Sequence, residues 1–483
     1  MTSTNLNTAS GAVQAGNAVL YDGSNVSSYS ERAAQWLSAL DYRDIPDDVL
    51  EQTKLRMLDV IGVTLAGSAL SYGPIAHDAA LALGGKAEST ILGFGERTGA
   101  ASAAMANGLM AHALEYDDTH NETLIHASVT SVTTALALGE SLQAPGPAVL
   151  TAIAGANELA CRIGIVAPDV LLPNGFHPTA VVGTFSATYL ACRLLGLDVA
   201  TTRNAVGIAG SMTSGSMECW SDNTHAKTLH PGWSAHAGIT AAYLARAGLT
   251  GPARIFEGRW GFFRSHVQQP DYAFRFDRLL DRIGDEWESR NLSFKPYPVG
   301  HVIHPFLDAI LHLYRQEGLR AEQVREIRCL VHPDWLTVVC EPVAEKLSPK
   351  TAWHGRISLQ YTLAEALHTG HLDVRSYADE SLFNPAILTL AKKIVCEADP
   401  NPTDRKQFKG WVVVDAVDGR RLERVEPFNR GSRENPMTAS EIVEKFRVNL
   451  PEKFHGTKAD AIVAAVTELN RAPAIAGLIA LCQ

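Results

Sequence analysis

The sequence contains few charged residues and no strongly basic run. Charged side chains make up 19% of the 483 residues, and the formal net charge is −10. Because binding to nucleic acid phosphates needs clustered lysine and arginine, this balance argues against nucleic acid as a partner. The 46% share of hydrophobic residues is instead typical of a soluble globular protein that is long enough for two domains and a large core.

The cysteines lack the spacing of a disulfide framework or a metal site. They are seven in number, at Cys161, Cys192, Cys219, Cys329, Cys340, Cys396 and Cys482. No C-x-x-C pair occurs, which argues against a zinc or iron–sulfur centre. An odd number of unpaired cysteines suits a reducing compartment, so the cytoplasm is the expected location.

Neither a targeting segment nor a membrane span is evident in the sequence. Residues 1–26 are rich in serine, threonine, asparagine, alanine and glycine, contain no arginine or lysine, and lack the apolar core of a signal peptide. We expect them to form a disordered tail. No uninterrupted apolar run reaches 18 residues, so no interaction with a membrane is expected.

Apolar residues recur at helical spacing through most of the chain and at strand spacing in one later segment. The predicted helices span residues 27–40, 46–66, 75–83, 100–114, 129–142, 148–163, 180–195, 201–209, 235–246, 439–447 and 458–470. Short strand-like runs appear at 327–332, 411–417 and 421–425, the last two joined by an Asp418-Gly419 turn. The chain is therefore predicted to be mainly α, with a separate α+β segment and two C-terminal helices that pack back on the first part.

A glycine-rich segment at residues 93–99, G-F-G-E-R-T-G, is superficially similar to a dinucleotide-binding loop. Such a loop requires an acidic residue at the end of a second strand. Here the next acids end a predicted helix, so we expect no nucleotide cofactor.

Acidic residues and histidines gather in residues 106–126, which read A-N-G-L-M-A-H-A-L-E-Y-D-D-T-H-N-E-T-L-I-H. The first half is rich in alanine and methionine and has no proline, which predicts a helix. The helix ends in E-Y-D-D, where the negative end of its dipole disfavours carboxylates. A departure of this kind from local preference is typical of functional sites, although a solvated turn would also fit the pattern.

Three further runs set histidine or lysine beside proline or glycine at the border of a helical stretch. They are residues 174–179 (N-G-F-H-P-T), 226–233 (A-K-T-L-H-P-G-W) and 294–304 (F-K-P-Y-P-V-G-H-V-I-H). Side chains at such borders can face a cleft. His177 lies at a predicted helix start, where the positive end of the dipole lowers its pKa and favours the neutral, basic form.

In their order and spacing these four runs resemble the MmgE/PrpD family, which includes 2-methylcitrate dehydratase, cis-aconitate decarboxylase and iminodisuccinate epimerase. The resemblance covers the chain from about residue 27 to the C-terminus. It implies an all-helical domain made of residues 27–268 and 428–483, a smaller α+β lid domain of residues 269–427 inserted between them, and a cleft between the two. It also implies a homodimer.

The resemblance further implies a cofactor-free lyase, either a dehydratase or a decarboxylase, that moves a proton next to a carboxylate of a small di- or tricarboxylic acid. Residue by residue, the resemblance implies that His126 and His177 transfer protons and that Lys227 and Lys295 anchor substrate carboxylates. It implies that Asp117, Asp118 and Thr119 orient His126 or bind substrate and water. His230 and His304 are implied as further cleft residues. The chain has Glu115 where many relatives have aspartate.

Three alternatives remain open at this point. An epimerase of a small dicarboxylate would take and return a proton with the same groups. A metal-dependent hydrolase would use Asp117, Asp118, His120 and His126 as ligands, although no H-E-x-x-H pair sets two of them on one helix face. A helical binding protein could retain the cleft without catalysis. His112, within the alanine-rich helix, is expected to be a packed core residue.

Overall fold

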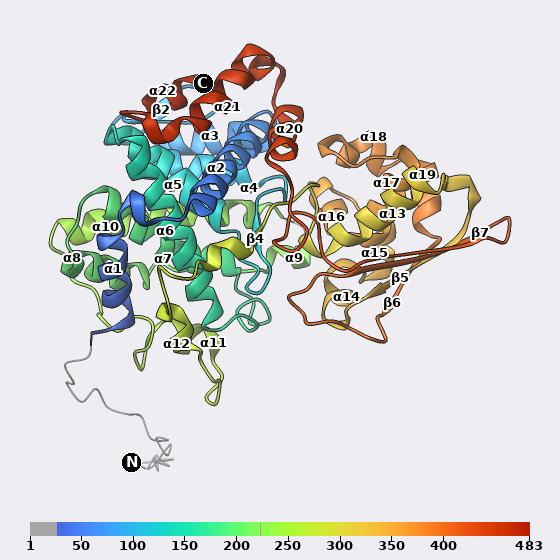
Figure 1. The fold of residues 1–483 in the computed structure, drawn as a ribbon, viewed down its shortest axis with the longest axis horizontal. Helices are drawn as coiled ribbons and strands as arrows, with labels where there is room; N and C mark the ends of the chain where they lie inside the picture. Colours follow the sequence, from blue (N-terminus) through green and yellow to red (C-terminus); the bar gives the residue numbers. More distant parts are fainter. Residues whose placement is uncertain (1–26, 223) are drawn as a thin grey trace, which may run out of the picture.

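The computed structural model describes residues 27–222 and 224–483, and the predicted tail at residues 1–26 lies outside this part. The fold is mainly α, as the sequence predicts (Figure 1). The helices before residue 281 are α1 (Tyr29–Ala39), α2 (Asp47–Ser68), α3 (Tyr72–Leu83), α4 (Ala100–His112), α5 (Ala127–Ser141), α6 (Gly146–Ile165), α7 (Pro178–Leu194), α8 (Val199–Ala209), α9 (Cys219–Asp222), α10 (Ala226–Arg246), α11 (Phe262–Val267) and α12 (Phe276–Leu280).

The helix predicted at residues 235–246 is too short, because the observed helix α10 already begins at Ala226. The prediction began the helix at Ala235, after the run that contains Pro231, and an interior proline removes a backbone hydrogen bond and usually breaks or bends a helix. Here Pro231 lies inside α10, where Ser234 bonds the carbonyl of His230 at 3.0 Å and that of Ala180 at 2.7 Å. These contacts and close packing on α4 hold the extra turns in place.

A four-stranded sheet with helices on it forms the smaller lobe on the right of Figure 1. Its elements are α13 (His304–Gln316), β5 (Val324–Val331), α14 (Pro333–Val339), α15 (Val343–Leu347), α16 (Ala352–Arg356), α17 (Leu359–Thr369), α18 (Asp379–Leu382), α19 (Pro385–Ala391), β6 (Ile394–Ala398), β7 (Gly410–Ala416) and β8 (Arg421–Glu426). The strand order is β6-β5-β7-β8. The predicted Asp418-Gly419 hairpin is confirmed, whereas β6, which pairs parallel to β5, was not predicted.

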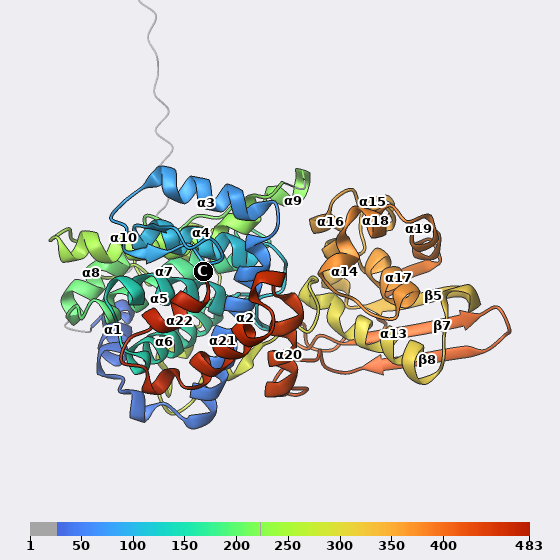
Figure 2. The ribbon, with the colours of Figure 1, turned by 90° about the horizontal axis from the view of Figure 1, so that it is seen from above.

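The C-terminal helices α20 (Ala439–Asn449), α21 (Thr457–Thr467) and α22 (Ala476–Leu481) return to the helical part of the molecule. Phe446, Phe454 and Ile462 share one buried apolar cluster with Met57 and Ile61 of α2. Figure 2 shows α21 and α22 over the helical part of the molecule and α20 beside α2, on the side that faces the smaller lobe. The predicted return of the chain end is therefore confirmed.

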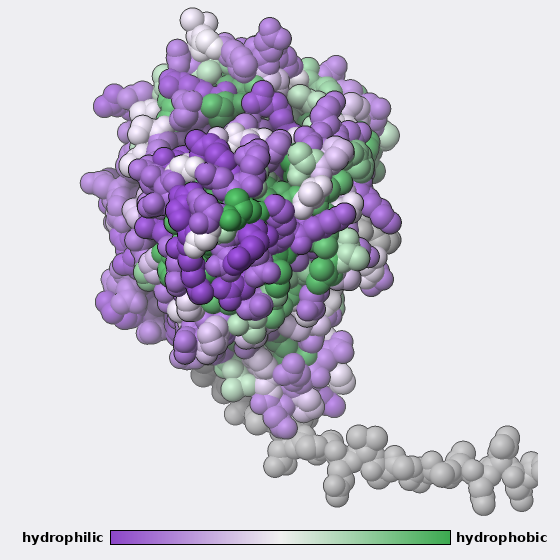
Figure 3. All heavy atoms as spheres, turned by 90° about the vertical axis from the view of Figure 1, so that its right-hand side faces the viewer, coloured by the Kyte–Doolittle hydropathy of each residue, from purple (hydrophilic) through white to green (hydrophobic). Residues whose placement is uncertain are grey.

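Helix α6 is long and apolar enough to cross a membrane by length and composition. In the structure, 94% of its most apolar window is buried against other parts of the protein. Packing within the helical part therefore accounts for its apolar composition. The surface of the smaller lobe contrasts with this buried helix. Figure 3 shows that the end of the lobe is mostly hydrophilic, with apolar side chains only in small groups and narrow bands.

Candidate active site

A short antiparallel ladder joins two of the four runs. Strand β3 (Thr119–His120) pairs with β4 (Leu292–Ser293), so that Thr119 lies opposite Ser293. The pairing brings Lys295, two residues beyond β4, beside the acidic run that follows α4. Lys295 donates a hydrogen bond to the backbone carbonyl of Glu115 at 3.1 Å.

A close helix crossing brings the third run to the same place. Gly108 of α4 and Gly232 of α10 lie so close that a Cβ on Gly108 would be 2.6 Å from the Cα of Gly232. Backbones approach this closely only where both residues are small. Because of this contact, Lys227 near the start of α10 reaches His112 at the end of α4, with 3.1 Å between Nζ and Nε2.

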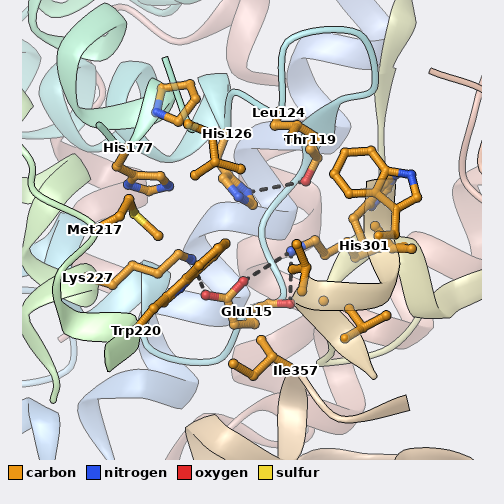
Figure 4. Close-up of a pocket in the computed structure, with 18 residues that line it drawn as sticks. Glu115, Thr119, Leu124, His126, His177, Met217, Trp220, Lys227, His301 and Ile357 are labelled. Atoms are coloured by element: carbon orange, nitrogen blue, oxygen red, sulfur yellow. Dashed lines mark hydrogen bonds and ion pairs between the residues drawn. The ribbon is translucent and has the colours of Figure 1, made fainter. Parts of the chain in front are cut away.

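The four runs surround one pocket. Its lining includes Thr119, His126, His177, Lys227 and Lys295. Figure 4 shows these groups approaching a shared hollow from several elements, with Glu115 beside Lys227. Helix α14 and neighbouring residues of the smaller lobe contribute Trp335, Val338, Val339 and Ile357 to the opposite wall.

Glu115 links the two lysines at the charged end of the pocket. One carboxylate oxygen makes a short contact with the ammonium of Lys227, and the other lies 3.6 Å from that of Lys295. Burial alone would raise the pKa of Glu115, but the two lysines outweigh it and hold that pKa well below its usual range. Burial lowers the pKa of Lys295, an effect that Glu115 and Asp117 partly offset.

His126 is held in one tautomer at the N-terminus of α5. Its Nδ1–H donates to the backbone carbonyl of Asp118 at 2.8 Å, and Thr119 Oγ1 lies 3.3 Å from the same nitrogen. Because a carbonyl can only accept, Nε2 is the unprotonated nitrogen of the neutral ring. Burial lowers the pKa of His126 to about 3, which keeps the ring neutral.

His177 forms the N-cap of α7, as predicted, and it is paired with another histidine. Its Nδ1 lies 3.0 Å from Nδ1 of His230 on α10. Burial, followed by the charge of Lys227, lowers the pKa of His177 well below its usual range. His230 itself does not line the pocket but supports His177 from behind.

Asp117 connects two of the histidines. Its Oδ2 lies 2.9 Å from Nδ1 of His112 and 3.3 Å from Nδ1 of His126. Burial raises the pKa of Asp117, but His112 and His126 outweigh burial and lower it below its usual value. His112 is fully buried as predicted, yet its contacts with Asp117 and Lys227 make it a supporting part of the site as well as a core residue.

Asp118 and His304 lie outside the pocket lining, as Asp117 and His230 do. The Asp118 carboxylate accepts from the backbone N–H of Ser128 at 3.1 Å and from its hydroxyl, and it faces Arg56 at 3.7 Å. It therefore caps α5, while its carbonyl orients His126. His304 bonds the carbonyl of Val299 at 3.2 Å behind the pocket wall.

His301 lines the pocket instead of His304, a role that the sequence reasoning missed. Its Nε2 lies 3.1 Å from side-chain atoms of both Asn121 and Asn429, and among the described residues its Nδ1 has no hydrogen-bond partner. Burial lowers its pKa well below the usual range. The residue stands in the run at 294–304, but only the turn of the chain after Gly300 decides which of its two histidines faces the pocket.

The ligand set considered for a metal does not come together. His120 turns toward Glu288, with 3.2 Å between Nε2 and Oε1, and away from His126. A different trio, His112, His126 and His177, has nitrogens within 4.8 Å of one another. Both ring nitrogens of His112 are already engaged by Asp117 and Lys227, so this trio fits acid–base chemistry better than it fits a metal ion.

Two family models and several known proteins match this chain. Residues 31–275 match the MmgE/PrpD N-terminal domain, and residues 297–471 match the MmgE/PrpD C-terminal domain. A cis-aconitate decarboxylase-like protein of Aspergillus oryzae is 26% identical over 92% of this chain and 95% of its own length. Human cis-aconitate decarboxylase is 27% identical over 92% of both chains. A 2-methylcitrate dehydratase of Salmonella typhimurium is 25% identical over 56% of this chain and 57% of its own.

Proposed function

Because the chain belongs to the MmgE/PrpD family, we propose that it is a cofactor-free lyase that acts on a small carboxylic acid with more than one carboxylate. The observation that carries the proposal is the convergence of Lys227, Lys295, His126 and His177 on one pocket. Cations bind the carboxylates of a substrate, and neutral buried histidines exchange a proton beside them.

Decarboxylation is the reaction that the comparisons favour. The decarboxylase relatives match over 92% or more of this chain, whereas the dehydratases match over 56% to 68%. In this step the bond to one carboxylate breaks, CO2 leaves, and the remaining electron pair takes up a proton at carbon. Dehydration, in which a base removes a proton and water leaves, is the second candidate.

His177 is the proton donor in this proposal. Its Nδ1 is engaged by His230, so a proton on Nε2 is available to the substrate carbon. A bound polyanion raises the pKa of nearby histidines, which favours protonation of the site when the substrate arrives. Lys227 and Lys295 hold the substrate, and His126, with its free Nε2, is the base that a dehydration would need.

The test is turnover of cis-aconitate and 2-methylcitrate, followed by mass spectrometry of the products and measurement of CO2. Lys295→Ala and His177→Ala should each lower kcat/KM at least about 100-fold. The exposed residues Lys392 and His368 provide matched controls through Lys392→Ala and His368→Ala. Unchanged activity in Lys295→Ala and His177→Ala would refute the site. Loss of activity on chelation, with recovery in Zn²⁺ or Mn²⁺, would favour the metal-dependent alternative.

The smaller lobe is proposed to act as an inserted lid over the pocket, with the helical domain formed by residues 27–268 and 428–483. The contribution of Trp335 and Val338 to the pocket wall supports this role, because movement of the lobe would open or close the site. Small-angle scattering with and without a bound polycarboxylate tests it, and an unchanged radius of gyration would contradict closure.

A homodimer in the cytoplasm is proposed as the working form of the protein. Helix α3 presents Ile75 and Leu83 with 57% and 62% of their surfaces exposed, as an interface between subunits would require. Among the described residues no two cysteines form a disulfide, which suits a reducing compartment. Light scattering after gel filtration tests the oligomeric state, and cell fractionation tests the location.

A further inference from the structure

Most of the pocket wall is apolar. The helical part contributes Leu172, Met217 and Trp220, and the smaller lobe contributes Trp335, Val338 and Val339. Trp335 and Val339 are buried, so they present a fixed apolar surface. An all-polar tricarboxylate would leave this surface covered only by water, whereas an apolar group on the substrate would fill it.

The charged end carries less positive charge than two lysines suggest. Of the described residues that line the pocket, only Glu115, Lys227 and Lys295 are ionised, because burial keeps the lining histidines neutral. Glu115 bonds Lys227 directly and lies 3.6 Å from Lys295. The three groups together therefore carry one net positive charge, and buried Asp117 behind His126 reduces the local potential further.

A net charge of one at the lysine end matches a substrate with two carboxylates better than a substrate with three. One negative charge is offset by the excess lysine charge, and a second is offset when a histidine takes up a proton on binding. A third carboxylate would lie in the pocket without a cation beside it, which is costly in a buried site.

We propose that the substrate is an alkyl-substituted dicarboxylate, in which a hydrocarbon group replaces one carboxymethyl arm of an aconitate- or citrate-like acid. This inference rests on the proposed lyase function and specifies its substrate class. The two carboxylates bind at Lys227 and Lys295, and the alkyl group packs against Trp220, Trp335 and Val338. For this substrate class the step is a dehydration: His126 removes a proton from the carbon beside one carboxylate, the hydroxyl on the neighbouring carbon leaves as water with a proton from His177, and the citrate-like hydroxy acid becomes the aconitate-like unsaturated acid.

The test compares the binding of inert ligands to the full-length protein by calorimetry. The probes are succinate, 2-methyl-, 2-butyl- and 2-hexylsuccinate, and the tricarboxylate tricarballylate. Affinity should rise up to about fourfold for each methylene that is buried, and 2-butylsuccinate should bind more tightly than tricarballylate. In Trp335→Ala and Val338→Thr the dependence on chain length should become flatter.

Glu115 provides a second and independent measurement. Glu115→Gln keeps the shape of the side chain and raises the net charge of the lysine end by one, so tricarballylate should gain about tenfold in affinity relative to 2-butylsuccinate. A thermal melt of each variant verifies that it is folded.

The outcomes separate this inference from the proposed function. Tighter binding of tricarballylate with no dependence on chain length, together with faster turnover of cis-aconitate than of 2-butylmalate, would overturn the substrate class and leave the lyase intact. Failure of every carboxylate to bind would overturn both. Chain-length dependence that Trp335→Ala weakens would support both.

Discussion

The Nδ1 atoms of His177 and His230 lie 3.0 Å apart. At this distance one nitrogen carries the shared proton and the other accepts it, so the two rings must adopt opposite tautomers at this contact. When Nδ1 of His230 is the donor, Nε2 of His177 holds the proton that faces the pocket. His230 is also the more exposed of the pair, at 8% against 3%, which places it on the side from which a proton can be replaced.

His230→Phe should lower kcat at least about tenfold with little change in KM, because it removes the partner that fixes the tautomer of His177 without touching the lysines. His230→Asn, whose side chain can still form a hydrogen bond, should recover part of the loss. The solvent isotope effect on kcat should increase in His230→Phe as proton delivery becomes rate-limiting. Equal losses in both variants, with an unchanged isotope effect, would indicate only a packing role.

The contact of Glu115 with two lysines should make the site important for stability as well as for binding. Lys295→Met leaves the buried carboxylate with one ammonium partner, and we expect the free energy of unfolding to fall by about 3 kcal/mol. Glu115→Gln combined with Lys295→Met should cost less than the sum of the two single changes, since the second change no longer breaks the contact between Glu115 and Lys295. Urea unfolding of the single and double variants measures the coupling. Additive losses would show that the two residues do not interact.

The sequence predicts the helices and the residues of the site better than it predicts their roles. Apolar spacing and small residues identify α2, α4 and α7 to within a few residues, because tightly packed helices need that pattern. The four runs contain each lining residue that carries a charge or an imidazole. A motif marks where chemistry is concentrated in the chain, and this part of the prediction depends only on local residue type.

The direction of each side chain could not be predicted, because it depends on contacts between distant segments. Asp118 caps α5 through Ser128, and His304 lies behind the wall while His301 lines the pocket. The strand β6 was missed because its five residues, I-V-C-E-A, show no alternation of apolar and polar side chains, and pairing with β5 is what fixes them as a strand. The early start of α10 was missed because packing on α4 outweighs the effect of Pro231.

Acidification should destabilise the protein well before its carboxylates are protonated. Burial is the main cause that lowers the pKa of five histidines below the usual 6.5: His126, His177, His230, His301 and His304. Below pH 6.5 the unfolded chain therefore binds more protons than the folded one, and the free energy of unfolding falls as the pH falls. Each group contributes up to about 1.4 kcal/mol per pH unit until its lowered pKa is reached.

Two buried acids act in the opposite sense, because burial raises the pKa of Asp59 and Asp308 to about 6. The histidines outnumber them, so the net slope keeps its sign. Urea unfolding at pH 7.5, 6.5 and 5.5 measures how the free energy of unfolding depends on pH. His304→Gln should reduce that slope by an amount that corresponds to the uptake of up to one proton. A stability that is constant or rises between pH 7.5 and 5.5 would show that these histidines are protonated in the folded state.

The crossing of α4 and α10 should be sensitive to a single methyl group. A Cβ on Gly232 would lie 2.3 Å from the backbone oxygen of Met105, a distance that no side-chain rotation can relieve. Gly232→Ala should therefore push the helices apart and lower the free energy of unfolding by about 1–3 kcal/mol. Since Lys227 lies on the same helix five residues earlier, kcat/KM should fall as well.

Gly477→Ala is the matched control, because Gly477 lies in helix α22 and a Cβ there would meet nothing within 4 Å. Alanine is the better helix former, so this change should stabilise the protein by up to about 1 kcal/mol and leave activity unchanged. Thermal unfolding and kcat/KM of the two variants distinguish the effect of helix propensity from the effect of the close contact between α4 and α10. If Gly232→Ala behaved like Gly477→Ala, the position of Lys227 would not depend on the contact between α4 and α10.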